Sequence, residues 1–171
     1  ACCGLPITQK ESEWLALANG DSRLREGMRA LYGTFKDAPL LGSLVNPRAA
    51  GGDLIGAGFD ELEPLLSSAL RKERIRTSDE ATEAMMTASG LLDAARLLDA
   101  RYHLVITNVP YLARGKQDAA LKRFCETHYP DAKADLANVF LERCLELSRT
   151  SESREGAGVV QIVMPQNWLF L

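Results

Sequence analysis

The 171 residues are the length of one ordinary domain, and 46% hydrophobic with 25% charged residues is a globular composition that excludes disordered and fibrous classes. A net charge of −3 excludes a strongly basic nucleic-acid module of the histone or ribosomal type. No apolar run has the length of a transmembrane helix or a signal-peptide core, so we expect a cytoplasmic chain that does not contact a membrane.

The first hundred residues are predicted to be mainly helical. Residues 22–35 form the first predicted helix, with Asp21 or Ser22 as its N-cap. Its apolar residues recur at spacings of three and four and so share one face: Leu24, Met28, Leu31, Tyr32 and Phe35. Pro and Gly residues then predict a long connection over residues 37–58, and two further helices are predicted over residues 60–73 and 78–98.

After residue 101 the pattern changes from helical to strand-like. Residues 103–107 are a short apolar run rich in β-branched side chains, which predicts a parallel strand buried on both faces. Helices are predicted over residues 118–129 and 133–149, and a second strand over residues 159–164. Strand, helix and strand in this order predict a crossover unit of a doubly wound α/β sheet.

Cysteine and histidine spacing indicates no metal site. The cysteines contain no CxxC spacing, and His103 and His128 have no partner at ligand spacing, so we predict no metal ion. We expect reduced thiols at all four cysteines: Cys2, Cys3, Cys125 and Cys144.

A tetrad of residues, Asn108, Val109, Pro110 and Tyr111, follows the first predicted strand at its carboxyl end, where open parallel sheets bind their ligands. The tetrad resembles the Asn-Pro-Pro-Tyr signature of S-adenosylmethionine-dependent amino methyltransferases, chiefly those that methylate N6 of adenine in DNA. Val109 stands where the signature has Pro, but the role of that position belongs to a backbone carbonyl that Val also has. The alternative is an ordinary strand-to-loop turn that uses Asn and Pro.

The chemistry of an exocyclic amine explains these residue types. Such an amine is planar and a poor nucleophile, so oxygens that accept its hydrogens favour a tetrahedral nitrogen whose lone pair points at the methyl donor. The resemblance assigns this role to the side-chain oxygen of Asn108 and the carbonyl of Val109. Pro110 would stiffen the turn, and Tyr111 would stack on an adenine flipped out of the duplex.

Residues 102–171 as a whole resemble part of the large single-chain adenine methyltransferases of bacterial phage defence. The likeness is to the PglX type of bacteriophage exclusion and to related fused restriction-modification enzymes, and residues 111–117, 133–143 and 163–169 carry it. It implies an α/β fold, a partial doubly wound (Rossmann-like methyltransferase) sheet with a helical insertion. It also implies S-adenosylmethionine as methyl donor and duplex DNA as partner, with other phage-defence subunits as further candidates.

The donor-binding loop of that family is rich in glycine, and Gly4 is not followed by a second glycine at the required spacing. We therefore expect the donor loop upstream of Ala1, and we interpret the chain as a piece of a longer enzyme that is inactive by itself. Residues 1–7 would be the end of a sheet strand, residues 8–100 a helical insertion, and residues 101–171 the catalytic-loop half of the methyltransferase domain.

Basic residues next to the tetrad are candidate DNA contacts. Arg114 and Lys116 lead a group that also includes Lys122 and Arg123, and it is either a phosphate-binding patch or a solvated face. Two other functions stay open. A similar loop serves methyltransferases that modify glutamine side chains in protein-release factors, and the chain could also be a non-catalytic binding or assembly module.

Overall fold

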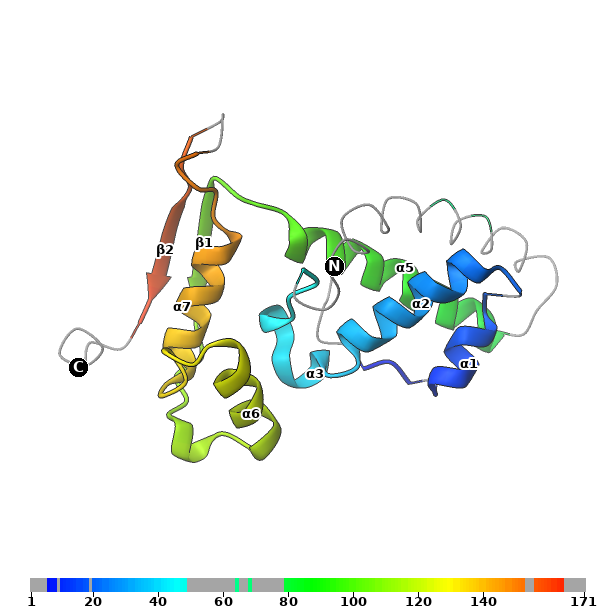
Figure 1. The fold of residues 1–171 in the computed structure, drawn as a ribbon, viewed down its shortest axis with the longest axis horizontal. Helices are drawn as coiled ribbons and strands as arrows, with labels where there is room; N and C mark the ends of the chain where they lie inside the picture. The colour runs from blue at the N-terminus through cyan, green and yellow to red at the C-terminus, as the bar shows by residue number, and fades with distance from the viewer. Residues whose placement is uncertain are drawn as a thin grey trace. The chain divides into compact units, whose positions relative to one another are not determined.

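The computed structural model describes residues 6–8, 10–18, 20–48, 64, 68, 79–152 and 156–164 (Figure 1). The chain divides into two compact units, Ala1–Asp99 and Ala100–Leu171, and each is described by itself. The first unit is helical where it is described, and the second combines helices with a small parallel sheet. This mixture of helices and strands is compatible with the predicted α/β class.

The first unit contains the helices α1 (Glu11–Ala16), α2 (Ser22–Phe35), α3 (Ala38–Leu41) and α5 (Asp79–Asp99), and the 3-10 turn η1 (Gly42–Leu44). The helices predicted over residues 22–35 and 78–98 are confirmed as α2 and α5. Asp21 is the N-cap of α2, where its carboxylate accepts hydrogen bonds of 3.0 Å from the amides of Arg23 and Leu24.

The long connection predicted after α2 is partly wrong, because α3 and η1 lie within it. Pro39 suggested a break in the helical pattern, but in the first turn of a helix the missing proline N–H is not needed. Residues 49–58 lie outside the described residues. The helix predicted over residues 60–73 also lies outside them, except for Pro64 and Ser68, which are helical.

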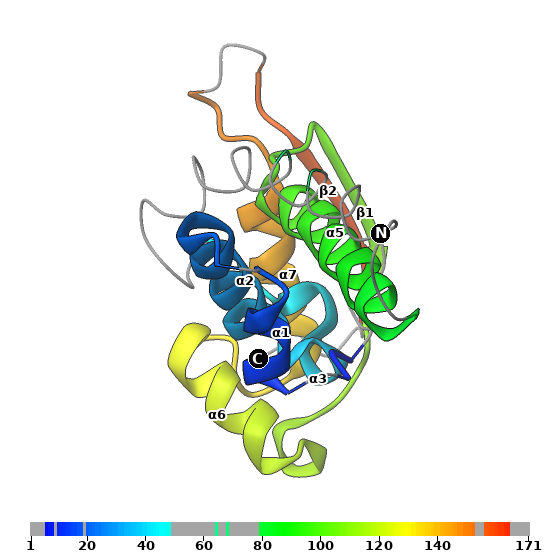
Figure 2. The same cartoon turned by 90° about the vertical axis from the view of Figure 1, so that its right-hand side faces the viewer.

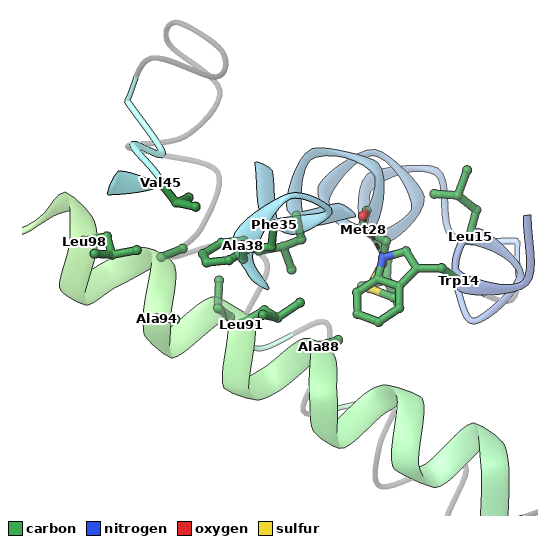
Figure 3. Close-up of a cluster of buried hydrophobic side chains, with 14 of the residues drawn as sticks. Trp14, Leu15, Met28, Phe35, Ala38, Val45, Ala88, Leu91, Ala94 and Leu98 are labelled. Atoms are coloured by element: carbon green, nitrogen blue, oxygen red, sulfur yellow. Dashed lines mark hydrogen bonds between the residues drawn. The ribbon is translucent and has the colours of Figure 1, made fainter. Parts of the chain in front are cut away.

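The core of the first unit forms between α1, α2 and α5 (Figure 3). Trp14 is fully buried, and its indole N–H donates a 2.8 Å hydrogen bond to the carbonyl of Met28. The predicted apolar face of α2 is buried, apart from Tyr32, which is half-buried and packs its ring near that of Trp14. The side chains that α5 contributes are Ala88, Leu91, Leu92, Ala94, Ala95 and Leu98. None of the helices among the described residues is long and apolar enough to cross a bilayer.

The second unit contains β1 (Leu104–Asn108), η3 (Arg114–Lys116), α6 (Ala119–His128), α7 (Leu136–Leu147) and β2 (Val159–Val163). The two strands pair in parallel from Leu104 with Val159 to Asn108 with Val163, as the strand pattern predicts. They run side by side in both views (Figures 1 and 2). The predicted helix over 118–129 is confirmed as α6. The helix predicted over 133–149 starts later, at Leu136, because Asp135 is its N-cap.

One face of this sheet is open within the described residues. Side chains along both strands alternate between half-buried and exposed, and the exposed set is largely apolar: Leu104, Ile106, Val159 and Val163. The prediction that the first strand is buried on both faces is therefore wrong for the described residues. The reason is that α7 covers only one face of the two strands, and no other described element covers the opposite face (Figure 1).

The start of β2 passes very close to the segment that leads into β1. The amide of Gly158 donates to the carbonyl of Arg149, and the amide of Arg149 donates to the carbonyl of Tyr102. A Cβ atom on Gly158 would lie 2.4 Å from Oγ of Ser148 and 2.5 Å from that Tyr102 carbonyl, so the backbones approach this closely only with glycine here. The close approach aligns the starts of the two strands, and equal strand lengths then bring their carboxyl ends to the same level.

Candidate active site

The predicted tetrad lies where both strands end. Asn108 is the last residue of β1, and its partner across the sheet is Val163, the last residue of β2. Val109 is buried and anchors the turn, whereas Pro110 and Tyr111 are exposed. The tetrad therefore presents polar and aromatic groups at the carboxyl edge of a parallel sheet, which is the edge where such sheets bind ligands.

The hydroxyl of Tyr111 connects the two strand ends. Its oxygen lies 3.4 Å from Oδ1 of Asn108 and 3.3 Å from the carbonyl oxygen of Val163. Both distances are long for O–H···O hydrogen bonds, so each contact is weak. Two acceptor oxygens thus converge on one donor position, and the same pair can accept hydrogens from another donor group placed there.

The loop after Tyr111 is fastened to the start of α7. The amide of Arg114 donates to the carbonyl of Ala134 at 3.0 Å, and the amide of Leu136 donates to the carbonyl of Leu112 at 3.1 Å. Gln117, at the end of the loop, is buried and donates from its side chain to the same Leu112 carbonyl at 3.0 Å. The loop is therefore held by its backbone and by one buried side chain.

The predicted basic patch is partly neutralised. Arg114 forms an ion pair with Glu126 of α6, a carboxylate that lies outside the predicted patch in the sequence. Lys116 is exposed on η3, and Arg123 is exposed on α6. Contact of Arg114 and Lys116 with DNA phosphates remains a prediction. For Arg114, the guanidinium would have to bind a phosphate and Glu126 together, or leave Glu126.

A polar cluster connects the end of α6 to α7. Arg143 is almost fully buried and donates a 2.8 Å hydrogen bond to Oε2 of Glu146, which also accepts a long contact of 3.5 Å from the hydroxyl of Tyr129. Burial, and then the negative charge of Glu146, raises the pKa of Tyr129 above its ordinary value of 10.0. Burial also raises the pKa of the thiols of Cys125 and Cys144.

These raised pKa values predict a loss of stability in alkaline solution. The unfolded chain loses these protons at lower pH than the folded chain, so the stabilisation is complete below the unfolded pKa values and is lost as the pH rises through the folded ones. For Tyr129 the loss begins near pH 10. Urea unfolding is monitored by circular dichroism between pH 9 and pH 11. As the pH rises over this range, we expect the urea midpoint of Tyr129→Phe to fall less steeply than that of the wild type. Identical slopes would contradict the role assigned to Tyr129.

The described residues contain no cluster of metal-ligating side chains, and the turn after β1 is not rich in glycine. No group of three or more His, Cys, Asp or Glu side chains is placed to hold a metal ion there. Cys125 and Cys144 are free thiols, and Cys2 and Cys3 lie outside the described residues. The turn after β1 contains one glycine, Gly115, and does not fit a glycine-rich donor loop. Residues 1–5 are not described, and Pro6 and Ile7 have no regular secondary structure.

Comparison with known proteins places most of this chain in a family. Residues 53–171, more than two thirds of the chain, match the family described as Eco57I restriction-modification methylase. The "Adenine-specific methyltransferase PglX" of Lacticaseibacillus casei (strain Zhang) is 31% identical over 81 residues, 47% of this chain and 6% of that protein. The "Adenine-specific methyltransferase BrxX" of Escherichia coli O9:H4 (strain HS) is 27% identical over 156 residues, 91% of this chain and 12% of that protein. The chain therefore spans a small part of the length of both relatives.

Proposed function

This chain belongs to the Eco57I restriction-modification methylase family, and we propose that it carries the base-binding loop of an enzyme that methylates N6 of adenine in duplex DNA. Two relatives bear the name adenine-specific methyltransferase, which supports adenine as the target. The observation that carries the proposal is the place of the tetrad: Asn108 ends β1 at the carboxyl edge of the parallel sheet, and its Oδ1 accepts only a long contact of 3.4 Å from the hydroxyl of Tyr111.

In the proposed reaction the amine of a flipped adenine donates its two hydrogens to acceptor oxygens of the loop. Oδ1 of Asn108 and the carbonyl of Val109 each accept one hydrogen, which directs the nitrogen lone pair outward, and the ring of Tyr111 stacks on the base. S-adenosylmethionine is the second substrate. The nitrogen–carbon bond forms as the carbon–sulfur bond breaks, the sulfur keeps the electron pair, and the positively charged methylated nitrogen then loses a proton to water or to an acceptor oxygen. Catalysis rests on positioning, and no general base is needed.

The fold that we propose for the whole domain is a doubly wound, Rossmann-like sheet in which β1 and β2 are inner strands. Their parallel pairing supports this, because parallel sheets are normally covered on both faces. The exposed apolar face of Leu104, Ile106, Val159 and Val163 is then where a further layer of the longer protein would pack. In this arrangement residues 8–100 are a helical insertion, residues 101–171 are the catalytic-loop half, and the donor-binding loop lies elsewhere in the enzyme.

Duplex DNA is the proposed partner, and the cytoplasm the proposed location. Lys116 is exposed on the 3-10 turn that follows Tyr111, and exposed Lys side chains beside a base-binding loop commonly contact phosphates. Arg114 would contact a second phosphate once its guanidinium binds both that phosphate and Glu126. Other phage-defence subunits are further proposed partners, in keeping with the restriction-modification family.

A substrate comparison in the full-length enzyme tests the proposal. The enzyme is incubated with S-adenosylmethionine carrying a labelled methyl group, and duplex DNA and protein-release factor are offered in the same assay. We expect the label to enter DNA. An amide nitrogen is also planar and suits the same acceptors, so label found only in protein would assign the loop to glutamine methylation. Label in neither substrate would favour a binding or assembly module.

A further inference from the structure

Gln117 is an unusual residue for a surface loop because it is 4% exposed. Its side-chain amide donates a hydrogen bond of 3.0 Å to the carbonyl of Leu112, the residue that directly follows Tyr111. A carbonyl needs a donor, so this contact fixes which end of the amide faces Leu112. The amide oxygen on the other end is buried and has no hydrogen-bond partner within the described part of the chain.

The carbonyl of Leu112 accepts a second hydrogen bond from the start of α7. The amide of Leu136, the first residue of α7, donates to it at 3.1 Å. Two donors from separate segments use both lone pairs of this oxygen, so the peptide plane between Leu112 and Ala113 cannot rotate without breaking one of them. This plane follows Tyr111 by one residue, so the two hydrogen bonds limit how far the backbone next to Tyr111 can move.

The hydrogen bond of Gln117 contributes little net stability. Removing it leaves the Leu112 carbonyl bonded to Leu136, and an apolar side chain of similar shape also removes the orphaned amide oxygen. The stability lost with the hydrogen bond and the stability gained by removing the unpaired buried oxygen approximately offset each other. The main consequence of the amide is therefore geometric: it adds a second constraint on the backbone next to Tyr111.

We propose that Gln117 is a positioning residue that holds the backbone after Tyr111 so that the aromatic ring meets the flipped base in one orientation. The inference rests on the proposed function of the Asn108 to Tyr111 loop. Gln117 does not touch the base in this scheme, and it acts through Leu112 and Tyr111. Small misplacements of a reacting or stacking group lower rates steeply, so a loosened loop reduces turnover without removing any contact to the methyl donor.

The test uses Gln117→Met in the full-length enzyme, which keeps the length of the side chain and removes the donor. We expect about a tenfold or larger loss of methylation rate, with S-adenosylmethionine affinity by calorimetry within about twofold of wild type. Emission of 2-aminopurine at the target position should show weaker quenching, because the ring of Tyr111 stacks less well. The matched control is Lys133→Met, an exposed position in the turn before α7, which should behave as wild type.

A double-mutant cycle separates positioning from a merely structural role. If Gln117 acts through Tyr111, then Gln117→Met lowers the rate no further in a Tyr111→Ala background, whereas general destabilisation would lower it by the same factor in both backgrounds. Equal losses in both backgrounds, a wild-type rate, or a variant that no longer binds the donor would each overturn the inference. Asn108→Ala is assayed in parallel. If it retains the wild-type rate, the proposed function fails, and if it is inactive while the cycle is additive, only the role of Gln117 fails.

Discussion

Asn108→Ala in the full-length enzyme is expected to lower the methylation rate by about two orders of magnitude or more, a loss of roughly 3 kcal/mol of transition-state stabilisation. The substitution removes Oδ1, one of the acceptors at the end of β1, and so leaves the adenine amine planar and poorly aligned with the methyl donor. The rate is measured under single-turnover conditions, and donor affinity is measured by calorimetry.

The control for this variant is Asn138→Ala, because Asn138 is a half-buried asparagine of α7 outside the proposed pocket. It should retain most activity. Donor affinity should stay close to wild type in both variants, since Asn108 is assigned to the base and not to the donor. An Asn108→Ala enzyme with wild-type turnover would remove Asn108 from the reaction.

Substitutions of Tyr111 are expected to distinguish the contribution of its ring to base binding from the contribution of its hydroxyl. Stacking needs an aromatic face, so Tyr111→Phe and Tyr111→Trp should keep most base binding, and Tyr111→Ala should lose about 1 to 3 kcal/mol. The structure agrees with a small role for the hydroxyl in stability, because its contacts to Asn108 and Val163 are 3.4 Å and 3.3 Å long. Base binding is followed by the emission of 2-aminopurine at the target position, which rises on unstacking and is quenched again on an aromatic ring.

The three Tyr111 variants control for one another, because all of them change the same exposed side chain. A large effect of Tyr111→Ala with small effects of Tyr111→Phe and Tyr111→Trp supports stacking. If the three behaved alike in base binding and in methylation, Tyr111 would be a structural turn residue, and the tetrad would lose much of its support as a base pocket.

Local sequence patterns were sufficient to predict the elements that have strong periodicity and clear ends. The apolar face of α2 and its Asp21 cap, the length of α5, and the two strands with their parallel pairing all agree with the structure. The short α3 and η1 were missed because Pro39 and Gly42 resemble loop residues, although both occur at the ends of short helical turns. A four-residue helix has too few positions to show a period.

The candidate site could be predicted only in part, because some of its contacts join segments that are distant in the sequence. Asn108 and Tyr111 are close in the chain, and their motif was visible. Val163 joins them through the register of β1 and β2, and no local pattern reveals a register. Glu126 and Gln117 were missed for a related reason, since the burial and pairing of a polar side chain depend on how the loop folds back onto α6 and α7.

Locating the methyl group in the product tests the central claim most directly. Duplex DNA is incubated with S-adenosylmethionine and the full-length enzyme, or its Asn108→Ala variant, and is then digested to nucleosides for mass analysis. We expect N6-methyldeoxyadenosine with the wild-type enzyme and a loss of that nucleoside by about two orders of magnitude with Asn108→Ala. A methyl group on cytosine, or equal yields of N6-methyldeoxyadenosine from both enzymes, would contradict the assignment of the Asn108 to Tyr111 loop to the adenine amine.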